Sequence, residues 1–177
     1  MHRQRCYLRT MNEVILVDEK DAEIGVSEKL KAHQLGLLHR AFSIFIFNSN
    51  NELLIQQRAQ GKYHSGGLWT NTCCSHPIPK MDLVKYAKQR LFDEMGMKVD
   101  DLQIKNHFIY RAEFPNGLIE HELDYILIGH SNEEPILNPE EAQNFEWISL
   151  DDLTSKIKMN PDQFTFWLKE IINRSLI

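Results

Sequence analysis

The feature that most limits how this chain can fold is one amphipathic segment, residues 82–95, in the middle of a sequence otherwise rich in strand-forming stretches. At about 100° per residue its apolar side chains fall on one stripe, made of Leu83, Val84, Ala87, Leu91 and Met95. Asp82 stands at the start, and Gly96 follows the last apolar residue as a C-terminal stop. We therefore expect one central helix that packs a single face on the core.

Strand patterns lie on both sides of this helix. The clearest is Ala41 to Phe47, which is aromatic and β-branched, and Pro115-Asn116-Gly117 is a hairpin signal between two more strands. The expected strands are 13–18, 23–26, 41–47, 52–57, 69–75, 102–114, 118–129 and 144–148. Ser27 is expected to cap a short helix through His33, Ser149 another, and Asn160-Pro161 to start the last. This order predicts an α+β fold with a mixed or antiparallel sheet.

The length of 177 residues, with 42% hydrophobic and 25% charged residues, predicts one globular domain with a substantial core. We expect the domain to span residues 1–177, with its core at about 14–148. Residues 149–177 should form C-terminal helices that cover a pocket or pack on the sheet.

Charge, hydrophobicity and cysteine content argue against a nucleic-acid-binding, membrane-spanning or disulfide-rich protein. A net charge of −5 argues against a basic nucleic-acid surface. No apolar run is long enough for a membrane span, and the basic start M-H-R-Q-R-C-Y-L-R-T is followed by no apolar segment, so no signal peptide is expected. Three cysteines, Cys6, Cys73 and Cys74, make a poor disulfide framework. We expect a cytoplasmic protein, monomeric or weakly homo-oligomeric.

The stretch L-W-T-N-T-C-C-S-H-P at 68–77 holds the most reactive pair. In an extended backbone Cys74 and His76 point to the same side, and Cys73 points to the other. A nucleophile or acid would then lie beside a metal ligand, although a cysteine alone is more often a small buried residue.

Two carboxylate groups also stand out. Glu94 projects within the apolar stripe of the helix, four residues after Arg90, so the two can touch. They form either an ion pair at the rim of the core or a cation and phosphate site. Glu120 and Glu122 share one face of a strand, as either a solvated strand end or a pair that needs a cation or a shared proton.

Basic and imidazole side chains offer partners for these carboxylates. His33 and His39 are six apart and converge only if Gly36 breaks the helix between them. Arg58 and Lys62 flank a loop and, with Arg90, could form a basic pocket for a diphosphate or, failing that, a solvated loop tip.

Several motifs, in order, resemble type 1 isopentenyl-diphosphate isomerases from about Val14 to Trp147. The most specific is W-T-N-T-C-C-S-H-P at 69–77, and the others are H-Q-L-G-L-L-H-R-A-F-S at 33–43, R-A-Q-G-K at 58–62 and Y-R-A-E-F-P-N-G-L-I-E-H-E at 110–122. The resemblance implies a Nudix-like fold, a mixed sheet sandwiched by helices. The helix carries Q-R-L-F-D-E-M-G-M at 89–97 where the Nudix pattern is R-E-x-x-E-E-x-G-x, so the leading Arg-Glu pair is missing. That departure argues against ordinary Nudix hydrolysis.

The resemblance also implies the activity and the site. The enzyme would interconvert isopentenyl and dimethylallyl diphosphate by adding a proton at C4 and removing one from C2. The diphosphate would bind with Mg²⁺ at Glu94 and the Cys74 carbonyl, and a second site would hold Mn²⁺ or Zn²⁺, or Fe²⁺. The implied metal ligands are His33, His39, His76, Glu120 and Glu122; His64 is a further polar loop residue that could substitute for His33. The implied catalytic residues are Cys74, Glu122 and its hydrogen-bonding partner Tyr110. The implied substrate-binding residues are Lys29, Arg58, Lys62, Arg90 and Trp147, the last as a wall over the hydrocarbon.

Two other classes of function stay open on the sequence. A Nudix-type diphosphohydrolase would release phosphate or a mononucleotide, and a metal-binding module without activity would use only the histidine–glutamate set. The diphosphohydrolase fits poorly with a helix that lacks the leading Arg-Glu pair of the Nudix pattern. The metal-binding module gives no function to Arg58, Lys62 and Arg90. Which of Cys74, Glu122 or Tyr110 gives the first proton does not follow from the sequence.

Overall fold

The computed structural model describes residues 12–62 and 64–177. Cys6 and the N-terminal segment interpreted as lacking a signal peptide lie outside the described residues. Among the helices that the structure describes, none is long and apolar enough to cross a membrane.

The described elements follow the order that the sequence predicts, except that the predicted strand 69–75 is divided into two. The strands are β1 (Glu13–Val17), β2 (Glu23–Glu28), β3 (His39–Phe47), β4 (Leu53–Arg58), β5 (Trp69–Thr70), β6 (Cys73–Ser75), β7 (Gln103–Glu113), β8 (Ile119–His130) and β9 (Ala142–Ile148). The helices are α2 (Lys29–Leu35), α3 (Leu83–Met95), α4 (Leu150–Met159), the 3₁₀ turn η1 (Pro161–Gln163) and α5 (Phe166–Asn173).

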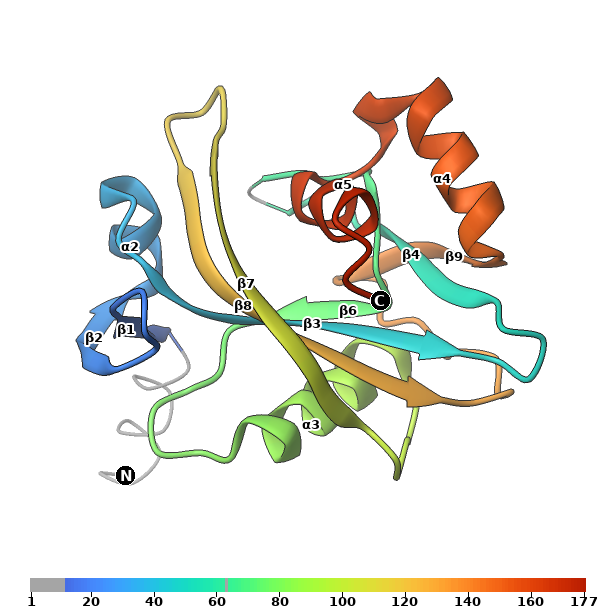
Figure 1. Ribbon diagram of the computed structural model, residues 1–177, viewed down its shortest axis with the longest axis horizontal. Coiled ribbons are helices and arrows are strands. Elements are labelled where there is room, and N and C mark those ends of the chain that lie inside the picture. The colour runs from blue at the N-terminus through green and yellow to red at the C-terminus, as the bar shows by residue number, and fades with distance from the viewer. Residues whose placement is uncertain (1–11, 63) are drawn as a thin grey trace.

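Strand β3 is the centre of the sheet. It pairs antiparallel with β1, β4 and β6 and parallel with β8, while β7 extends the sheet beyond β8 and β9 pairs with β4. In Figure 1 the long β7–β8 hairpin runs through the middle of the molecule, and its strand β8 lies beside β3 in parallel pairing. The expectation of a mixed sheet is confirmed by this combination of parallel and antiparallel neighbours.

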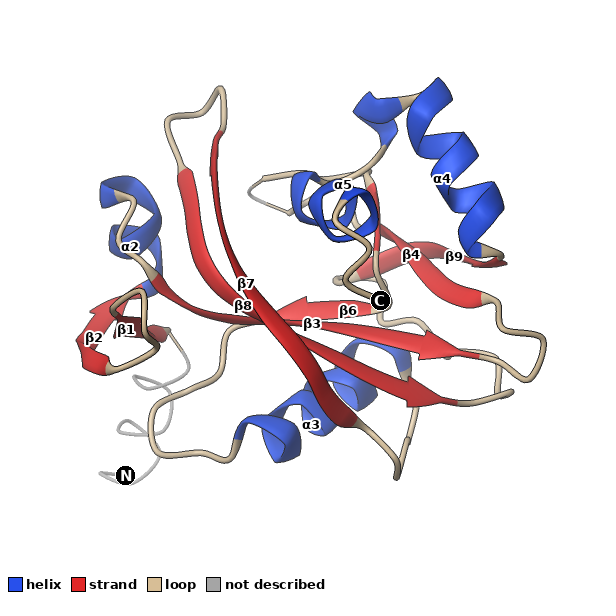
Figure 2. Cartoon of the chain, in the orientation of Figure 1, coloured by secondary structure: helices blue, strands red, loops and turns tan. Residues whose placement is uncertain are grey.

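Helices cover both faces of the curled sheet. Helix α3 lies on one side, and α4 and α5 lie on the other, as Figure 2 shows. One apolar cluster joins the α3 face to Phe42, Ile44 and Leu54, and a second joins α4 and α5 to Phe45 and Ile55. Because β3 and β4 side chains alternate between the two faces, the same strands supply both cores.

The central helix matches its sequence pattern. The Asp82 carboxylate accepts a hydrogen bond from the Lys85 amide, and Gly96 ends the helix with φ 67°. Ala87, Leu91 and Met95 are fully buried against the sheet, and Glu94 is buried beside them. An added Cβ at Gly96 would meet the Ile136 carbonyl at 2.9 Å, so the position has room only for glycine.

Two predicted helix starts are wrong. Ser27 belongs to β2, opposite Val14, and the Glu28 carboxylate caps α2 by accepting from the amides of Leu30 and Lys31. Asn160-Pro161 begins only η1, and α5 starts after Thr165. The Thr165 amide donates to the Trp69 carbonyl, which holds this part of the chain extended before α5 begins.

The predicted strand 69–75 is interrupted. It forms β5 and β6, with Asn71 and Thr72 between them. Both side chains bind neighbouring backbone: Asn71 donates to the carbonyls of Ile44 and Cys73, and Thr72 accepts from the Ile46 amide. These side-chain hydrogen bonds hold β6, and therefore Cys74, in place against β3.

Candidate active site

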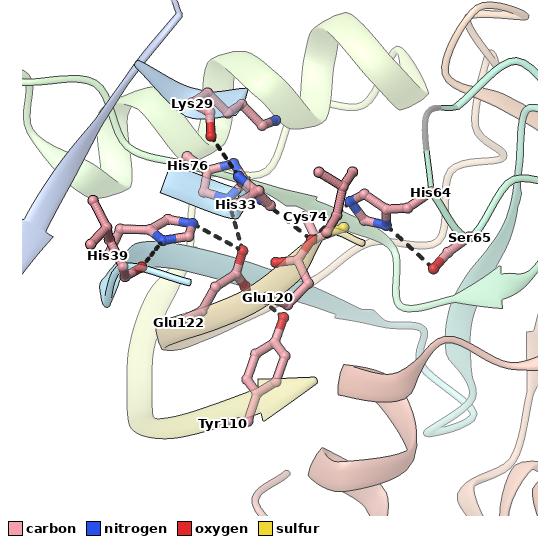
Figure 3. A network of polar contacts seen from close by, with 12 residues as sticks. Lys29, His33, His39, His64, Ser65, Cys74, His76, Tyr110, Glu120 and Glu122 are labelled. Atoms are coloured by element: carbon pink, nitrogen blue, oxygen red, sulfur yellow. Dashed lines mark hydrogen bonds and ion pairs between the residues drawn. The ribbon is translucent and has the colours of Figure 1, made fainter. Parts of the chain in front are cut away.

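Three histidines and two glutamates from four regions of the chain lie together inside the fold. They are His33 of α2, His39 of β3, His76 just after β6, and Glu120 and Glu122 of β8. One donor atom from each lies within 4.8 Å of all the others. Figure 3 shows their side chains pointing toward one another.

Local structure explains the convergence. Gly36 adopts the left-handed conformation that ends α2, and the His33 and His39 rings then lie 4.9 Å apart between centroids. The helix is therefore broken at Gly36, as the convergence of His33 and His39 requires. Parallel pairing of β3 with β8 places His39 directly opposite Glu122. The register of the two strands thus brings together residues 83 positions apart in the sequence.

The imidazoles are oriented for ligation. Nδ1 of His33 and of His39 each contacts a backbone carbonyl at 2.7 Å, that of Lys29 and of Leu37. Their Nε2 atoms therefore face the carboxylates, 3.4 Å from Glu120 Oε1 for His33 and 3.6 Å from Glu122 Oε1 for His39. Such backbone contacts are the usual way in which a metal-binding histidine is held in one tautomer.

The donor set fits a divalent cation. Within the part of the chain that the structure describes, His39 Nε2 and Glu120 Oε2 are buried and have no hydrogen-bond partner. Buried polar atoms in that condition are costly unless they bind something. Three imidazoles and two carboxylates form a site compatible with a divalent metal.

The local environment shifts the pKa values of both Glu122 and His76 downward. Burial alone would raise the pKa of Glu122, but His76, at 2.8 Å, and His39 hold that pKa well below its usual range. Burial and the positive charge of Lys29 lower the pKa of His76 well below its usual value. A carboxylate and a neutral imidazole are the forms that bind metals.

Cys74 lies in a cavity beside this cluster. It pairs with Ser43 of β3, and its sulfur accepts a hydrogen bond from Arg58 Nη1 at 3.6 Å. Burial raises the pKa of the Cys74 thiol to about 12, although the positive charge of Arg58 opposes this. Cys73 is fully buried in the core beneath α3, on the opposite side of β6, as the period of two predicts.

Tyr110 of β7 completes the acidic side. Its hydroxyl donates to Glu122 Oε2 at 2.6 Å. Burial and the charge of Glu122 raise the pKa of Tyr110 well above its usual value, so the phenol stays protonated. Glu122 therefore accepts hydrogen bonds through one oxygen from Tyr110 and contacts histidines through the other.

The basic residues line the same cavity. Its walls include Lys29, Arg58, Lys62, Arg90, Glu94 and Glu141 together with Cys74, His76, Tyr110, Glu120 and Glu122. Arg90 Nη2 lies 2.6 Å from Glu94 Oε1 and 3.2 Å from Glu141 Oε1, and Lys62 is ion-paired with Glu141. Cations and carboxylates thus alternate along one wall, which suits a diphosphate bound together with a cation.

The tryptophan that lines the cavity is not the one expected as the hydrocarbon wall. Trp147 is on β9, across from Leu54, packs against the α3 core and is not among the residues that line the cavity. Trp167 at the start of α5 does line it. Its indole N–H donates to Asn71 at 3.0 Å, and the Arg58 guanidinium lies 5.4 Å from its ring centroid.

Sequence reasoning also missed Glu141 and Gln56, which line the cavity. Trp167 and Glu141 lie outside every motif quoted for the resemblance, and Gln56 sits in an ordinary strand pattern. Only the fold brings these residues to the cavity. The bond from Trp167 to Asn71 joins residues 96 positions apart, a pairing that no local pattern records.

Comparison with known proteins places the fold. The NUDIX domain model matches residues 37–169. The crystal structure of DR0079 from Deinococcus radiodurans superposes with a TM-score of 0.76 at 17% identity, covering 92% of this chain and 98% of that one. At that identity the likeness concerns the fold alone.

Curated relatives are much closer in sequence. The isopentenyl-diphosphate Delta-isomerase 2 of Aromatoleum aromaticum is 47% identical over 165 residues, covering 92% of this chain and 86% of the relative. The isopentenyl-diphosphate Delta-isomerase of Pectobacterium atrosepticum is 48% identical over 159 residues, covering 90% and 88%. The chain therefore belongs to the NUDIX superfamily and, within it, to the isopentenyl-diphosphate Delta-isomerases.

Proposed function

We propose that this protein interconverts isopentenyl diphosphate and dimethylallyl diphosphate for isoprenoid biosynthesis, with the Cys74–Glu122 cavity as its active site. The observation that carries this proposal is that a thiol, a carboxylate and a set of basic side chains line one cavity. The similarity to isopentenyl-diphosphate Delta-isomerases over 90–92% of the chain supports the same activity.

The diphosphate binds at the basic wall in this proposal. Arg58, Lys62 and Arg90 provide charge there, with Lys29 on the metal-cluster side. Arginine favours phosphate because its planar fork donates two parallel hydrogen bonds. Held by its charged end, the substrate places its short hydrocarbon near Cys74 and Glu122, and fixed orientation of this kind can lower a barrier by several kcal/mol.

The protonation states of Cys74 and Glu122 suit a reaction that moves the double bond by adding one proton and removing another. The thiol of Cys74 holds its proton, because burial raises its pKa to about 12, whereas Glu122 is ionised. In the proposed step the Cys74 sulfur gives a proton to C4 of isopentenyl diphosphate, the double bond moves, and Glu122 accepts the proton lost from C2. Solvent then returns a proton to Cys74 and removes one from Glu122. Tyr110 donates to Glu122 and holds that carboxylate in place.

Trp167 takes the role first assigned to Trp147. A tertiary carbocation forms between the two proton transfers and needs electron density nearby to stabilise it. An indole ring attracts a cation over its face, and Trp167 is the tryptophan that lines this cavity.

Two divalent ions complete the proposal. Glu94, with the Cys74 backbone carbonyl, would hold Mg²⁺ together with the diphosphate. His33, His39, His76, Glu120 and Glu122 would hold Mn²⁺ or Zn²⁺, since Mg²⁺ prefers oxygen ligands. When bound, an ion at this second site would neutralise and fix the two carboxylates.

We further propose that residues 1–177 act as one domain in the cytoplasm, as a monomer or weak homo-oligomer that binds no nucleic acid.

The test is turnover of labelled isopentenyl diphosphate with Mg²⁺, before and after chelation of the purified protein. An acid-labile allylic diphosphate is the expected product, and chelation should abolish it. Cys74→Ala should lose turnover by at least about a thousandfold, in line with the loss of a reacting proton donor, while binding of the diphosphate survives. Cys73→Ala, one residue away but in the core, is the matched control and should keep near wild-type turnover.

Other outcomes have distinct meanings. Release of phosphate without an allylic product would favour a diphosphohydrolase. Near wild-type turnover in Cys74→Ala would show that the proposed proton donor is wrong. A severe loss of turnover in a folded Cys73→Ala would show that the assignment of the two neighbouring thiols is reversed.

A further inference from the structure

We propose that His64 is a positioning residue for the metal cluster, holding Glu120 in its ligating orientation by donating a hydrogen bond to it. This inference rests on the proposed metal site. It adds to that site a residue from the loop between β4 and β5, which also carries Lys62 of the proposed diphosphate wall.

The contact itself is short and buried. His64 Nε2 lies 2.8 Å from Glu120 Oε1, and both side chains are almost inaccessible to solvent. The same oxygen is 3.4 Å from His33 Nε2. The other oxygen, Oε2, is buried with no hydrogen-bond partner among the described residues. One oxygen of Glu120 is therefore occupied by histidine contacts, and the other is left for a cation.

The surroundings of His64 fix which nitrogen faces Glu120. Nδ1 lies 3.3 Å from the Ser65 hydroxyl, which can donate to it. Because the Glu120 carboxylate can only accept, Nε2 at 2.8 Å carries a hydrogen and donates to it. This bond between a ring N–H and a carboxylate orients the acceptor as well as the donor.

Aromatic packing fixes the ring plane. The His64 ring stacks on Phe114 at 5.2 Å between centroids and meets Trp167 edge-on at 6.0 Å. Few rotamers remain open to a ring held on two sides, so the direction of the Nε2–H bond is set before any ion binds. Preorganisation of this kind is what a residue outside the ligand set can contribute to affinity.

The geometry assigns His64 a place outside the ligand set. The residues whose donor atoms lie mutually within 4.8 Å include Glu120 but not His64. The His64 carbonyl also accepts from Arg58 Nη2 at 3.5 Å. The residue therefore joins a metal ligand to a residue of the diphosphate wall.

The experiment measures metal affinity, not turnover. Purified chains stripped of metal are titrated with Mn²⁺ or Zn²⁺ in competition with a chromophoric chelator, which gives the dissociation constant and the number of ions per chain. His64→Phe keeps the ring between Phe114 and Trp167 but loses the donor. His64→Gln places an amide N–H near the position of Nε2, and His64→Asn is one methylene too short to do so. His107→Phe, at an exposed ring on β7, controls for loss of a histidine elsewhere.

The expected result is one ion per chain in every variant, with affinity about 10–100-fold lower in His64→Phe and His64→Asn, as for other residues that orient a ligand. His64→Gln should recover most of the loss, and His107→Phe should match the wild type. If His64→Phe does not fold, the Gln and Asn variants alone carry the comparison.

Three outcomes would overturn the inference. Wild-type affinity in His64→Phe or His64→Asn would mean that the bond to Glu120 contributes nothing. A changed ligand-field spectrum with Co²⁺ in His64→Gln, indicating one ligand fewer, would make His64 a direct ligand. A wild-type chain that binds no ion would remove the metal site itself, and turnover that survives there would show that the isomerase proposal stands without it.

Discussion

Cys73 and Cys74 differ by one position and have different environments. The first packs among apolar residues under α3, and the second lies in the cavity with Arg58 against its sulfur. Alternation along β6 produces the difference, and the pairing of Cys74 with Ser43 fixes the register. At this scale a period of two in the sequence was enough to assign the faces.

The two tryptophans allow a test of the cavity wall at the same scale. Trp167→Leu removes the π face and should lower kcat/KM about tenfold or more, since a desolvated cation–π contact contributes about 1–2 kcal/mol. Trp147→Leu, on β9 outside the cavity lining, should keep kcat/KM within about twofold while lowering the melting temperature. Steady-state kinetics below both melting temperatures would measure this. A larger kinetic loss in Trp147→Leu than in Trp167→Leu would restore the original assignment.

Individual residues were predictable where a motif contains them. The residues His39, His76, Glu120 and Glu122 lie inside the stretches that carry the resemblance, and the structure brings them together. Trp167 lies beyond those stretches and reaches the cavity because α5 packs on the sheet and its indole binds Asn71. Contacts over such a separation depend on tertiary packing, which periodicity does not encode.

Elements were predicted better than their pairing. Local patterns predicted the hairpins, since Pro115-Asn116-Gly117 lies between β7 and β8, which pair antiparallel. The parallel pairing of β3 with β8, which sets His39 opposite Glu122, has no local signal, because parallel neighbours are joined through long crossovers. The start of the last helix was predicted wrongly because a long-range hydrogen bond, from the Thr165 amide to the Trp69 carbonyl, determines it.

The β1–β2 hairpin gives a prediction at the scale of elements. Asp21 in its turn accepts from Arg40 Nε of β3 at 2.6 Å and from the Tyr125 hydroxyl of β8. Burial and the Asp21 carboxylate raise the pKa of Tyr125 to about 12. The folded chain thus holds this proton more tightly than the unfolded chain, whose tyrosine pKa is about 10. The resulting stabilisation is fully present below about pH 10 and is lost as pH rises from about 10 to about 12.

Tyr125→Phe should therefore lower the free energy of unfolding by about 1 kcal/mol at pH 7, the usual contribution of such a hydrogen bond. The difference from wild type should shrink between about pH 10 and 12, where the wild-type phenol ionises. Urea unfolding at several pH values measures this, with Asp21→Asn as a control that removes the charge behind the shift. A difference that stays constant up to pH 12 would contradict it.

At the scale of the whole molecule, the site lies where separate parts of the fold meet. The residues of the metal cluster come from α2, β3, β8 and the segment that follows β6. Strands β4 and β7 and helices α3 and α5 contribute further residues to the cavity wall. Helix α3 contributes Arg90 and Glu94 from one layer, and α5 contributes Trp167 from the other. The cavity therefore exists only in the assembled sandwich, and the C-terminal helices are part of its wall as well as of the core.

Metal removal should consequently weaken the whole fold. An unfolded chain does not present five ligands from four regions, so an ion binds mainly the folded state. At a free concentration about 100 times the dissociation constant, such an ion adds about 2.7 kcal/mol to the free energy of unfolding. For a chain of this size that corresponds to a rise of about 5–10 °C in melting temperature. Thermal unfolding of stripped protein, with and without Mn²⁺ or Zn²⁺, measures it.

The control is a double variant, His39→Ala with Glu122→Gln, which removes two of the five donors. It should melt at the same temperature with and without the ion, because the remaining ligands bind too weakly to be filled at that concentration. An equal rise in the variant and the wild type would mean that the ion stabilises the protein from elsewhere on its surface. The rise should also be absent when a chelator is in excess, since the stabilisation depends only on free metal and its affinity for the folded chain.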